Sequence, residues 1–331
     1  MKTMRALLAT FLFLAPLAVF CGEERAVLLI HGGAGVRRAD LEEEREAAVR
    51  AVLEEALRAG HAVLLGGGSS LDAVERAIVV MEDAPEFNAG RGSALNSEGV
   101  VEMDASIMDG GDFLAGAVAG VVEVRNPIVL ARRVMTETPH VLLIGEGAGR
   151  LAREQGLVFE APEWFVMPRQ QERLEREKRR SGAANPAAGE PAARMGTVGA
   201  AALDATGRLA AGTSTGGMAN KRPGRVGDSP LIGAGTYAEN GVCGVSCTGH
   251  GEYFIRGVLA HEVAALMKHG GRDVAAAARE AIHGQLEERG GTGGMIALDA
   301  EGRVGIAFNT EGMYHGWITE AGEVRIEIFD Q

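Results

Sequence analysis

Apolar and polar positions along this chain alternate with periods that predict both strands and helices. Ala26–Ile30 is a short apolar run that predicts a strand, and a helical pattern rich in Glu and Ala runs from about Leu41 to Ala59. After Gly66–Ser70 a second helix is predicted, because its apolar residues recur on one face and Ser69 or Ser70 can serve as its N-cap. The apolar residues of that face are Leu71, Val74, Ala77, Ile78 and Met81.

The middle of the chain continues with apolar runs and then changes character. Val101–Met108 and Ala115–Val124 predict strands, Val141–Ile144 predicts a fully buried strand, and residues 127–135 have a helical pattern. Residues 169–196 are first crowded with charge and then dominated by Ala, Gly and Pro. Because such a composition buries little apolar surface, we predict a mobile, exposed linker over this segment.

The part that follows begins with strands, continues with helices and ends with strands. Thr197–Leu203 is apolar and β-like, and helical patterns cover Glu252–Lys268 and Val274–Glu287. Two similar turns, Leu203–Arg208 and Leu298–Arg303, predict hairpins in which a glycine takes the left-handed position. This order favours an α+β fold with two mostly antiparallel sheets covered by helices over a regular βαβ alternation.

The first residues have the pattern of a secretory signal peptide. Lys2 and Arg5 precede the apolar run Ala6–Phe20, so residues 1–21 are predicted to direct export, with a periplasmic destination; a buried N-terminal helix is the alternative. Cys21 resembles the lipid-anchoring cysteine of bacterial lipoproteins. Lipidation is disfavoured because Phe20 stands where such sites have a small residue.

Charge and glycine content narrow the classes of function. The 45 acidic residues exceed the 33 basic ones and give a net charge of −12, which argues against a nucleic-acid partner. Glycine accounts for 48 of 331 residues, about twice the usual share of roughly 7%. The chain therefore needs many tight turns and close backbone approaches.

Several familiar sites are excluded by the sequence. The chain has no dinucleotide fingerprint and no P-loop, and Ala265 stands where a zinc-protease motif beginning at His261 would need its second ligand. Cys243 and Cys247 would lie roughly 13 Å apart on one side of a strand. This separation is beyond disulfide reach, so both are predicted to be buried free thiols.

Hydroxyl residues among glycines form the remaining candidate chemistry. They occur in three runs, Gly196–Gly199, Thr213–Gly217 and Ser246–Gly249. A threonine nucleophile needs a base, and its own α-amine serves if the chain is cut just before it. Such an amine has a pKa of about 7.7–8 and is partly neutral near pH 7. The Gly196–Thr197 bond fits this requirement, and an ordinary strand threonine is the alternative.

A longer series of motifs, in order, resembles the plant-type (type III) L-asparaginase / isoaspartyl peptidase family of N-terminal nucleophile (Ntn) hydrolases. The resembling segments are His31–Gly35, Phe87–Gly90, Met103–Gly110, Gly145–Ala148, Met195–Gly199, Thr213–Met218, Gly224–Pro230 and Thr248–Glu252. The resemblance implies an αββα sandwich and self-cleavage into an α subunit, residues 22–196, and a β subunit, residues 197–331. The two subunits would form one domain and associate as a dimer of αβ heterodimers.

The resemblance also implies a role for individual residues. Thr197 would be the nucleophile, Thr215 would hydrogen-bond beside it, and the Thr248 hydroxyl with the Gly249 N–H would form the oxyanion hole. Arg225 would hold the substrate's α-carboxylate.

Four further roles follow from the same resemblance. Asp228 would hold the substrate's α-ammonium, Gly251 would contact the substrate, Asn88 would order the surroundings of the nucleophile, and His31 would pack or hydrogen-bond near the site. A structural sodium ion would be bound by backbone carbonyls, namely those of Met81, Glu82, Ala84, Phe87, Ala89 and Arg91.

The implied activity is hydrolysis of L-asparagine to aspartate and ammonia, and cleavage of β-aspartyl dipeptides through an acyl-enzyme on Thr197. No catalytic cofactor is expected. A glycosylasparaginase-like amidase and an exported binding protein that kept the fold without the chemistry are the alternatives.

Overall fold

The computed structural model describes residues 25–183 and 196–329. The predicted signal peptide with Cys21, and residues 184–195 of the predicted linker, lie outside the described residues. In the part that is described, no helix combines the length and the apolar character needed to cross a bilayer.

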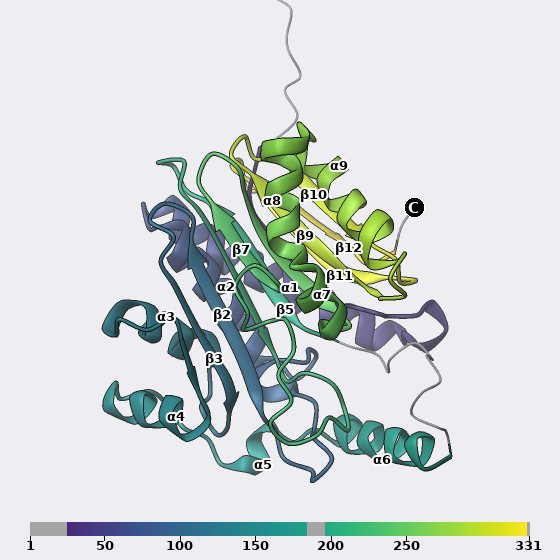
Figure 1. The fold of residues 1–331 in the computed structure, drawn as a ribbon. Coiled ribbons are helices and arrows are strands. Elements are labelled where there is room, and N and C mark those ends of the chain that lie inside the picture. The colour runs from purple at the N-terminus through teal and green to yellow at the C-terminus, as the bar shows by residue number, and fades with distance from the viewer. Residues whose placement is uncertain (1–24, 184–195, 330–331) are drawn as a thin grey trace, which may run out of the picture.

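Two stacked β-sheets form the centre of the molecule (Figure 1). The larger sheet has eight strands, in the spatial order β12 (Val324–Glu327), β11 (Met313–Thr319), β1 (Ala26–Ala34), β5 (Val198–Leu203), β6 (Leu209–Thr215), β2 (Met103–Asp109), β3 (Ala115–Val121) and β4 (Leu142–Ile144). The smaller sheet has four, in the order β10 (Val304–Phe308), β9 (Gly293–Asp299), β8 (Cys243–Gly249) and β7 (Thr236–Glu239). All neighbouring pairs are antiparallel except β3 and β4.

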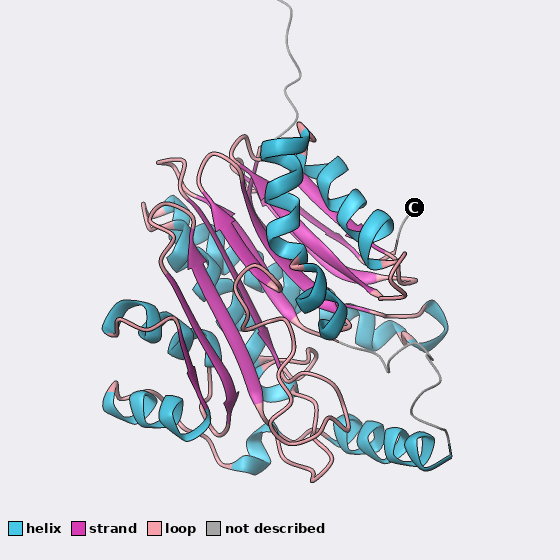
Figure 2. Ribbon diagram, viewed as in Figure 1, coloured by secondary structure: helices cyan, strands magenta, loops and turns pink. Residues whose placement is uncertain are grey.

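Helices cover the outer face of each sheet (Figure 2). The larger sheet is covered by α1 (Glu43–Leu65), α2 (Ser70–Asp83), α3 (Pro127–Glu137) and α4 (Gly145–Glu154), and the smaller one by α7 (Gly251–Gly257), α8 (Leu259–Gly270) and α9 (Val274–Arg279) with a π-helical continuation, Glu280–Leu286. Separate apolar clusters fill the two helix–sheet layers and the space between the sheets. The predicted four-layer αββα sandwich is confirmed.

Strands from both sides of Thr197 alternate within the larger sheet. β5, which begins directly after Thr197, lies between β1 and β6, and β6 pairs with β2. Each side of the Gly196–Thr197 bond therefore completes the sheet of the other, and the two sides share one core. The thiols of Cys243 and Cys247 are buried and free, as predicted.

The prediction of a structureless linker from residue 169 is wrong over its first half. Pro168–Ala183 form helix α6, which follows the short helix α5 (Pro162–Phe165). Only Gln170 and Leu174 of the part of α6 whose burial is described are buried, so the helix lacks a continuous apolar stripe. The apolar periodicity that marks a helix in the sequence is therefore missing, although its Glu, Arg and Lys residues favour helix.

Two other predictions also need correction. β4 is not a buried strand, because it forms an edge of the larger sheet and leaves Val141 and Ile144 exposed. The helix predicted over Glu252–Lys268 is two helices, α7 and α8, separated at Val258, whose φ of 51° is left-handed.

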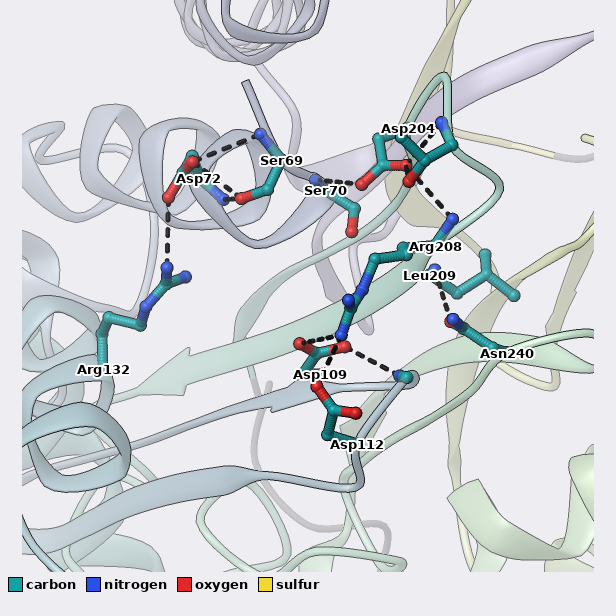
Figure 3. Close-up of polar contacts among 12 residues, drawn as sticks. Ser69, Ser70, Asp72, Asp109, Asp112, Arg132, Asp204, Arg208, Leu209 and Asn240 are labelled. Carbon is teal, nitrogen blue, oxygen red and sulfur yellow. Dashed lines mark hydrogen bonds and ion pairs between the residues drawn. The ribbon is translucent and has the colours of Figure 1, made fainter. Parts of the chain in front are cut away.

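The two predicted hairpins are confirmed, and the first of them is tied firmly to its neighbours. Gly207 and Gly302 both have a φ of 80°, in the left-handed region that favours glycine. In the first turn, Asp204 Oδ1 accepts hydrogen bonds from the N–H groups of Thr206 and Arg208 at 2.9 and 3.1 Å, and Oδ2 accepts one from the N–H of Ser70 at 3.1 Å (Figure 3). The turn is thereby joined to the first turn of α2.

The neighbouring polar groups complete this network. Arg208 pairs with Asp109 at 3.0 Å and with Asp112 at 2.8 Å (Figure 3). At the start of α2, Ser69 is the N-cap, with a capping box to Asp72. One end of the β5–β6 hairpin is thus fixed by polar side chains that satisfy one another.

Candidate active site

The opposite end of the β5–β6 hairpin holds the predicted nucleophile. Thr197 immediately precedes β5, and Thr215 ends β6, so the antiparallel register places the two residues side by side. The Thr197 hydroxyl lies 3.1 Å from Thr215 Oγ1 and 2.8 Å from the carbonyl oxygen of Gly196. The structure thus brings Thr197 and Thr215 together.

The Gly196 carbonyl is the centre of the local hydrogen bonding. Asn88 Nδ2 donates to its oxygen at 2.6 Å, and Thr215 Oγ1 lies within donating distance at 3.2 Å. Because the N–H of Ala94 donates to Asn88 Oδ1, and the N–H of Gly217 to Thr215 Oγ1, both side chains direct a proton toward Gly196. These donors surround the atom on which negative charge would develop if Thr197 attacked this carbonyl.

The end of β1 connects Thr197 with the second sheet. Gly33 has a φ of 107°, and a methyl group there would lie 2.8 Å from Gly196 Cα and 3.0 Å from Thr197 N. The next residue, Ala34, donates its N–H to Thr248 Oγ1 over 3.4 Å. Thr197 of one sheet and Thr248 of the other therefore approach two consecutive residues at the end of β1.

Gly249 follows Thr248 at a position that no larger residue could occupy. Its φ is 154°, and a Cβ there would lie 2.6 Å from the Thr292 carbonyl oxygen and 2.7 Å from the Phe254 ring. This crowding fixes the backbone, and with it the N–H for which the family resemblance implies a role in the oxyanion hole.

Asp228 is a buried carboxylate, one oxygen of which has no hydrogen-bond partner among the described residues. It is 5% exposed, and a Cβ on Gly251 would lie 2.6 Å from its Oδ1. Its Oδ2 is buried without a hydrogen-bond partner among the described residues. Burial raises the pKa of Asp228 to about 7. A cationic ligand at this position would supply the missing partner.

Arg225 lies next to these residues but does not pair with Asp228. Its Nε and Nη2 instead bind the Glu252 carboxylate at 3.0 and 2.9 Å, an interaction that the sequence analysis missed. A Cβ on Gly217 would lie 3.4 Å from Arg225 Nη1 and 3.1 Å from Lys221 Nζ, so two cations face the same glycine. Lys221, also missed, is buried and donates to the Glu102 carbonyl oxygen at 2.7 Å. Lys221 lies between the family motifs Thr213–Met218 and Gly224–Pro230. This position is the signal in the sequence that could have pointed to it.

Comparison with known proteins agrees with this arrangement. An asparaginase family model matches residues 24–328, which is most of the chain. The chain belongs to the asparaginase family. An isoaspartyl peptidase from Salmonella typhimurium is 48% identical over 297 residues, covering 88% of this chain and 95% of that protein. The human isoaspartyl peptidase/L-asparaginase is 44% identical over 276 residues, covering 83% of this chain and 87% of that protein.

In this member of the asparaginase family, His31 anchors a buried chain of hydroxyl groups beneath the nucleophile. Its Nε2 lies 2.9 Å from Ser246 Oγ, which lies 2.6 Å from Thr213 Oγ1, which in turn accepts from Thr236 Oγ1 at 2.5 Å. Burial lowers the pKa of His31 to about 3, so the ring is neutral. The expected hydrogen bonding of His31 near the site is confirmed, and Thr213 and Ser246 serve this network.

The segment predicted to bind sodium folds back on itself after α2. Because α2 ends at Asp83, the carbonyls of Met81 and Glu82 lack partners within the helix. A Cβ on Gly90 would overlap the Glu82 carbonyl oxygen, and one on Gly92 would overlap that of Phe87. The Phe87 oxygen accepts from Arg169 Nη2 at 3.2 Å and retains a second lone pair. Within residues 25–183 and 196–329, no group of three or more His, Cys, Asp or Glu side chains could hold a metal.

Proposed function

We propose that this chain is a threonine amidohydrolase that activates itself by cutting its Gly196–Thr197 bond. It hydrolyses L-asparagine to aspartate and ammonia, and it cleaves β-aspartyl dipeptides, in agreement with the names of its relatives. One observation carries the proposal: the Thr197 hydroxyl lies against the Gly196 carbonyl, whose oxygen is held by Asn88 and Thr215.

Self-cleavage begins with attack of Thr197 Oγ1 on the Gly196 carbonyl carbon. Asn88 Nδ2 and the Thr215 hydroxyl stabilise the resulting oxyanion. The C–N bond then breaks, the hydroxyl proton passes to the Thr197 nitrogen, and an ester is left between Gly196 and Thr197. Water hydrolyses this ester, which gives a Gly196 carboxylate, a free Thr197 hydroxyl and a free Thr197 α-amine.

The free amino-acid end of the substrate binds to Arg225 and Asp228. The α-ammonium pairs with Asp228, whose Oδ2 needs a partner. The α-carboxylate pairs with Arg225. Since Glu252 holds Nε and Nη2 of Arg225, the Nη1 edge that faces Gly217 receives the carboxylate, with Lys221 adding positive charge beside it. Gly251 gives the ammonium access, because any side chain there would meet Asp228.

Amide hydrolysis then uses the new amine as the base. The Thr197 amine accepts the proton of its own hydroxyl as Oγ1 attacks the side-chain amide carbon. The Thr248 hydroxyl and the Gly249 N–H donate to the oxyanion, and because Ala34 already donates to Thr248 Oγ1, the Thr248 proton is free for this purpose. The amine passes the proton to the leaving ammonia or amino acid, and water releases aspartate from Thr197.

Substitution of Thr197 tests this proposal. Thr197→Ala should remain one chain and release no ammonia from asparagine, whereas Thr197→Ser keeps a hydroxyl and should cleave itself and retain reduced activity. A denaturing gel and an ammonia assay on the purified proteins measure both effects. Asparagine hydrolysis by Thr197→Ala would contradict the assignment.

A structural sodium ion in the turn after α2 is part of the proposal. The carbonyls of Met81, Glu82, Ala84, Phe87, Ala89 and Arg91 would hold it. Backbone oxygens suit a hard cation, and the orphan carbonyls at the end of α2 support the site. The ion would stabilise the turn that carries Asn88.

Assembly and export complete the proposal. The mature αβ units associate as a dimer of αβ heterodimers, supported by the exposed apolar side chains of Val141 and Ile144 at a sheet edge. Export to the periplasm is supported by the signal-like pattern of residues 1–21 and by the start of the family match at residue 24.

A further inference from the structure

The space beside the nucleophile lies on the side away from Arg225 and Asp228. A cavity of about 440 Å³ is lined by Gly33, Asn88 and Gly196, and it is bounded by side chains of α1 and α6. Neither Arg225 nor Asp228 lines this cavity, and Arg225 instead lines a separate hollow with Lys221. A substrate held by its aspartyl end has room for its other end in the first cavity, which borders Gly33 and Gly196.

Five arginines line this cavity, and we refer to three of them, Arg45, Arg169 and Arg173, as the arginine cluster. Arg45 donates to the Glu86 carbonyl oxygen at 3.3 Å, and Arg169 donates to the carbonyl oxygens of Pro85 and Phe87. Nη2 of Arg173 is buried and has no hydrogen-bond partner among the described residues.

The arginine cluster forms no ion pair with a carboxylate of the described residues. Four acidic residues, Asp40, Glu42, Glu86 and Glu172, line the same cavity, but no carboxylate of the described residues lies within 4.0 Å of the three guanidinium groups of the cluster. Burial lowers the pKa of Arg173 to about 10, with Glu177 acting to raise it and Arg176 and Arg45 acting to lower it further. Arg173 therefore remains cationic at neutral pH. A buried guanidinium nitrogen without a hydrogen-bond partner among the described residues, beside two further guanidinium groups, is suited to binding an anion.

We propose that the arginine cluster binds the α-carboxylate of the amino acid on the leaving side of a β-aspartyl dipeptide. This inference rests on the proposed function, and it assigns the cluster to substrate selection. With the aspartyl part at Arg225 and Asp228 and the scissile carbonyl at Thr197, the second residue extends past Gly33 into the cavity. Asparagine releases ammonia and has no carboxylate on its leaving side, so the cluster favours dipeptides over asparagine.

The Gly196 carboxylate made by self-cleavage is a second carboxylate that the arginine cluster could bind. Gly196 lines the cavity and would compete for the arginine cluster if its new carboxylate turned toward α6. The two sources differ in a measurable way, because only binding of the substrate's carboxylate makes the reaction rate depend on that group.

The test measures kcat/KM of the mature enzyme for β-aspartyl-leucine, for its C-terminal amide and for asparagine. We expect the wild type to prefer the acid over the amide about tenfold or more, since removing one partner of a charge-assisted hydrogen bond costs roughly 1.5–3 kcal/mol. Arg173→Gln should lower this preference to near one. Arg179→Gln, an exposed arginine of the same helix, is the matched control and should keep the wild-type ratio.

The outcomes separate this inference from the proposed function. Equal kcat/KM for the acid and the amide in the wild type, a test that needs no variant to fold, would overturn it. A wild-type preference that persists in Arg173→Gln would also overturn it and leave the cluster to the Gly196 carboxylate. A wild type that hydrolyses none of the three compounds would refute the proposed function itself.

Discussion

Both ends of the β5–β6 hairpin carry threonines and lie near aspartates, but among the described residues the polar groups have hydrogen-bond partners at the turn and lack some of them near the other end. At the turn, Asp204 receives hydrogen bonds on both oxygens, and Arg208 is paired with Asp109 and Asp112. At the other end, Thr197 and Thr215 point at a peptide carbonyl. Nearby, Asp228 keeps a buried oxygen without a partner among the described residues.

The two aspartates show what this difference means physically. Burial raises the pKa of Asp204, but hydrogen bonds from Thr206, Ser70 and Arg208 outweigh it and lower the pKa below its usual value. Asp228 lacks comparable donors, and burial raises its pKa to about 7. The turn therefore stabilises the fold, whereas the open end is costly until a ligand arrives, as expected of a functional site.

Removing a hydroxyl from each end should separate the two roles most strongly. Thr215→Val should slow self-cleavage about 10²–10³-fold, because it removes a donor that stabilises the Gly196 oxyanion. It should also lower kcat, because it removes the hydroxyl that lies 3.1 Å from the nucleophile. Thr206→Val at the turn is the matched control and should leave kcat within twofold. Steady-state kinetics with asparagine, and a gel time course of cleavage, measure these effects. Equal losses in both variants would erase the functional difference between the two ends.

Acid pH should weaken substrate binding at the open end. Asp228 pairs with the substrate's ammonium only when ionised, and its pKa is raised to about 7. KM for asparagine should therefore rise as pH falls below about 7, approaching tenfold per pH unit, because one proton must be displaced. A KM that stays constant between pH 8 and pH 5.5 would exclude Asp228 as the ammonium ligand.

A change at the turn should affect stability and spare catalysis. Asp204→Ala leaves several hydrogen-bond donors unpaired and should lower the free energy of unfolding by roughly 1–3 kcal/mol, with kcat/KM unchanged. Since the folded-state pKa of Asp204 is depressed, its contribution is present above the unfolded-state pKa and is lost as pH falls through the folded-state value. Thermal melts of the wild type and Asp204→Ala at pH 7 and pH 3 test this. An equal Tm for the two proteins at pH 7 would show that Asp204 does not stabilise the fold.

The sequence predicts the turn end better than the open end. The hairpin glycines and the cap at Ser69 are local signals, because each depends on neighbouring residues only. The family motifs imply that Thr197, Thr215 and Asn88 share a site. No local pattern in the sequence predicts this, because the three residues come from distant parts of the chain. The pairing of Arg225 with Glu252 was missed because it depends on how α7 is oriented.

Helix α6 and the arginine cluster show where sequence patterns fail. α6 has almost no apolar face, so its charged composition was interpreted as a linker. The cluster joins Arg45 of α1 with Arg169 and Arg173 of α6, and no periodic pattern connects residues of two helices that meet only in the folded chain. The exposure of β4 was missed because an apolar run does not indicate whether a strand lies at the centre or at the edge of a sheet.

The most direct test of the account is N-terminal sequencing, with intact-mass measurement, of purified active enzyme. We predict two fragments, one of which comprises residues 197–331 and begins with a free Thr197. Full activity in a single polypeptide that is unbroken at Gly196–Thr197 would contradict the claim that Thr197 supplies both hydroxyl and amine.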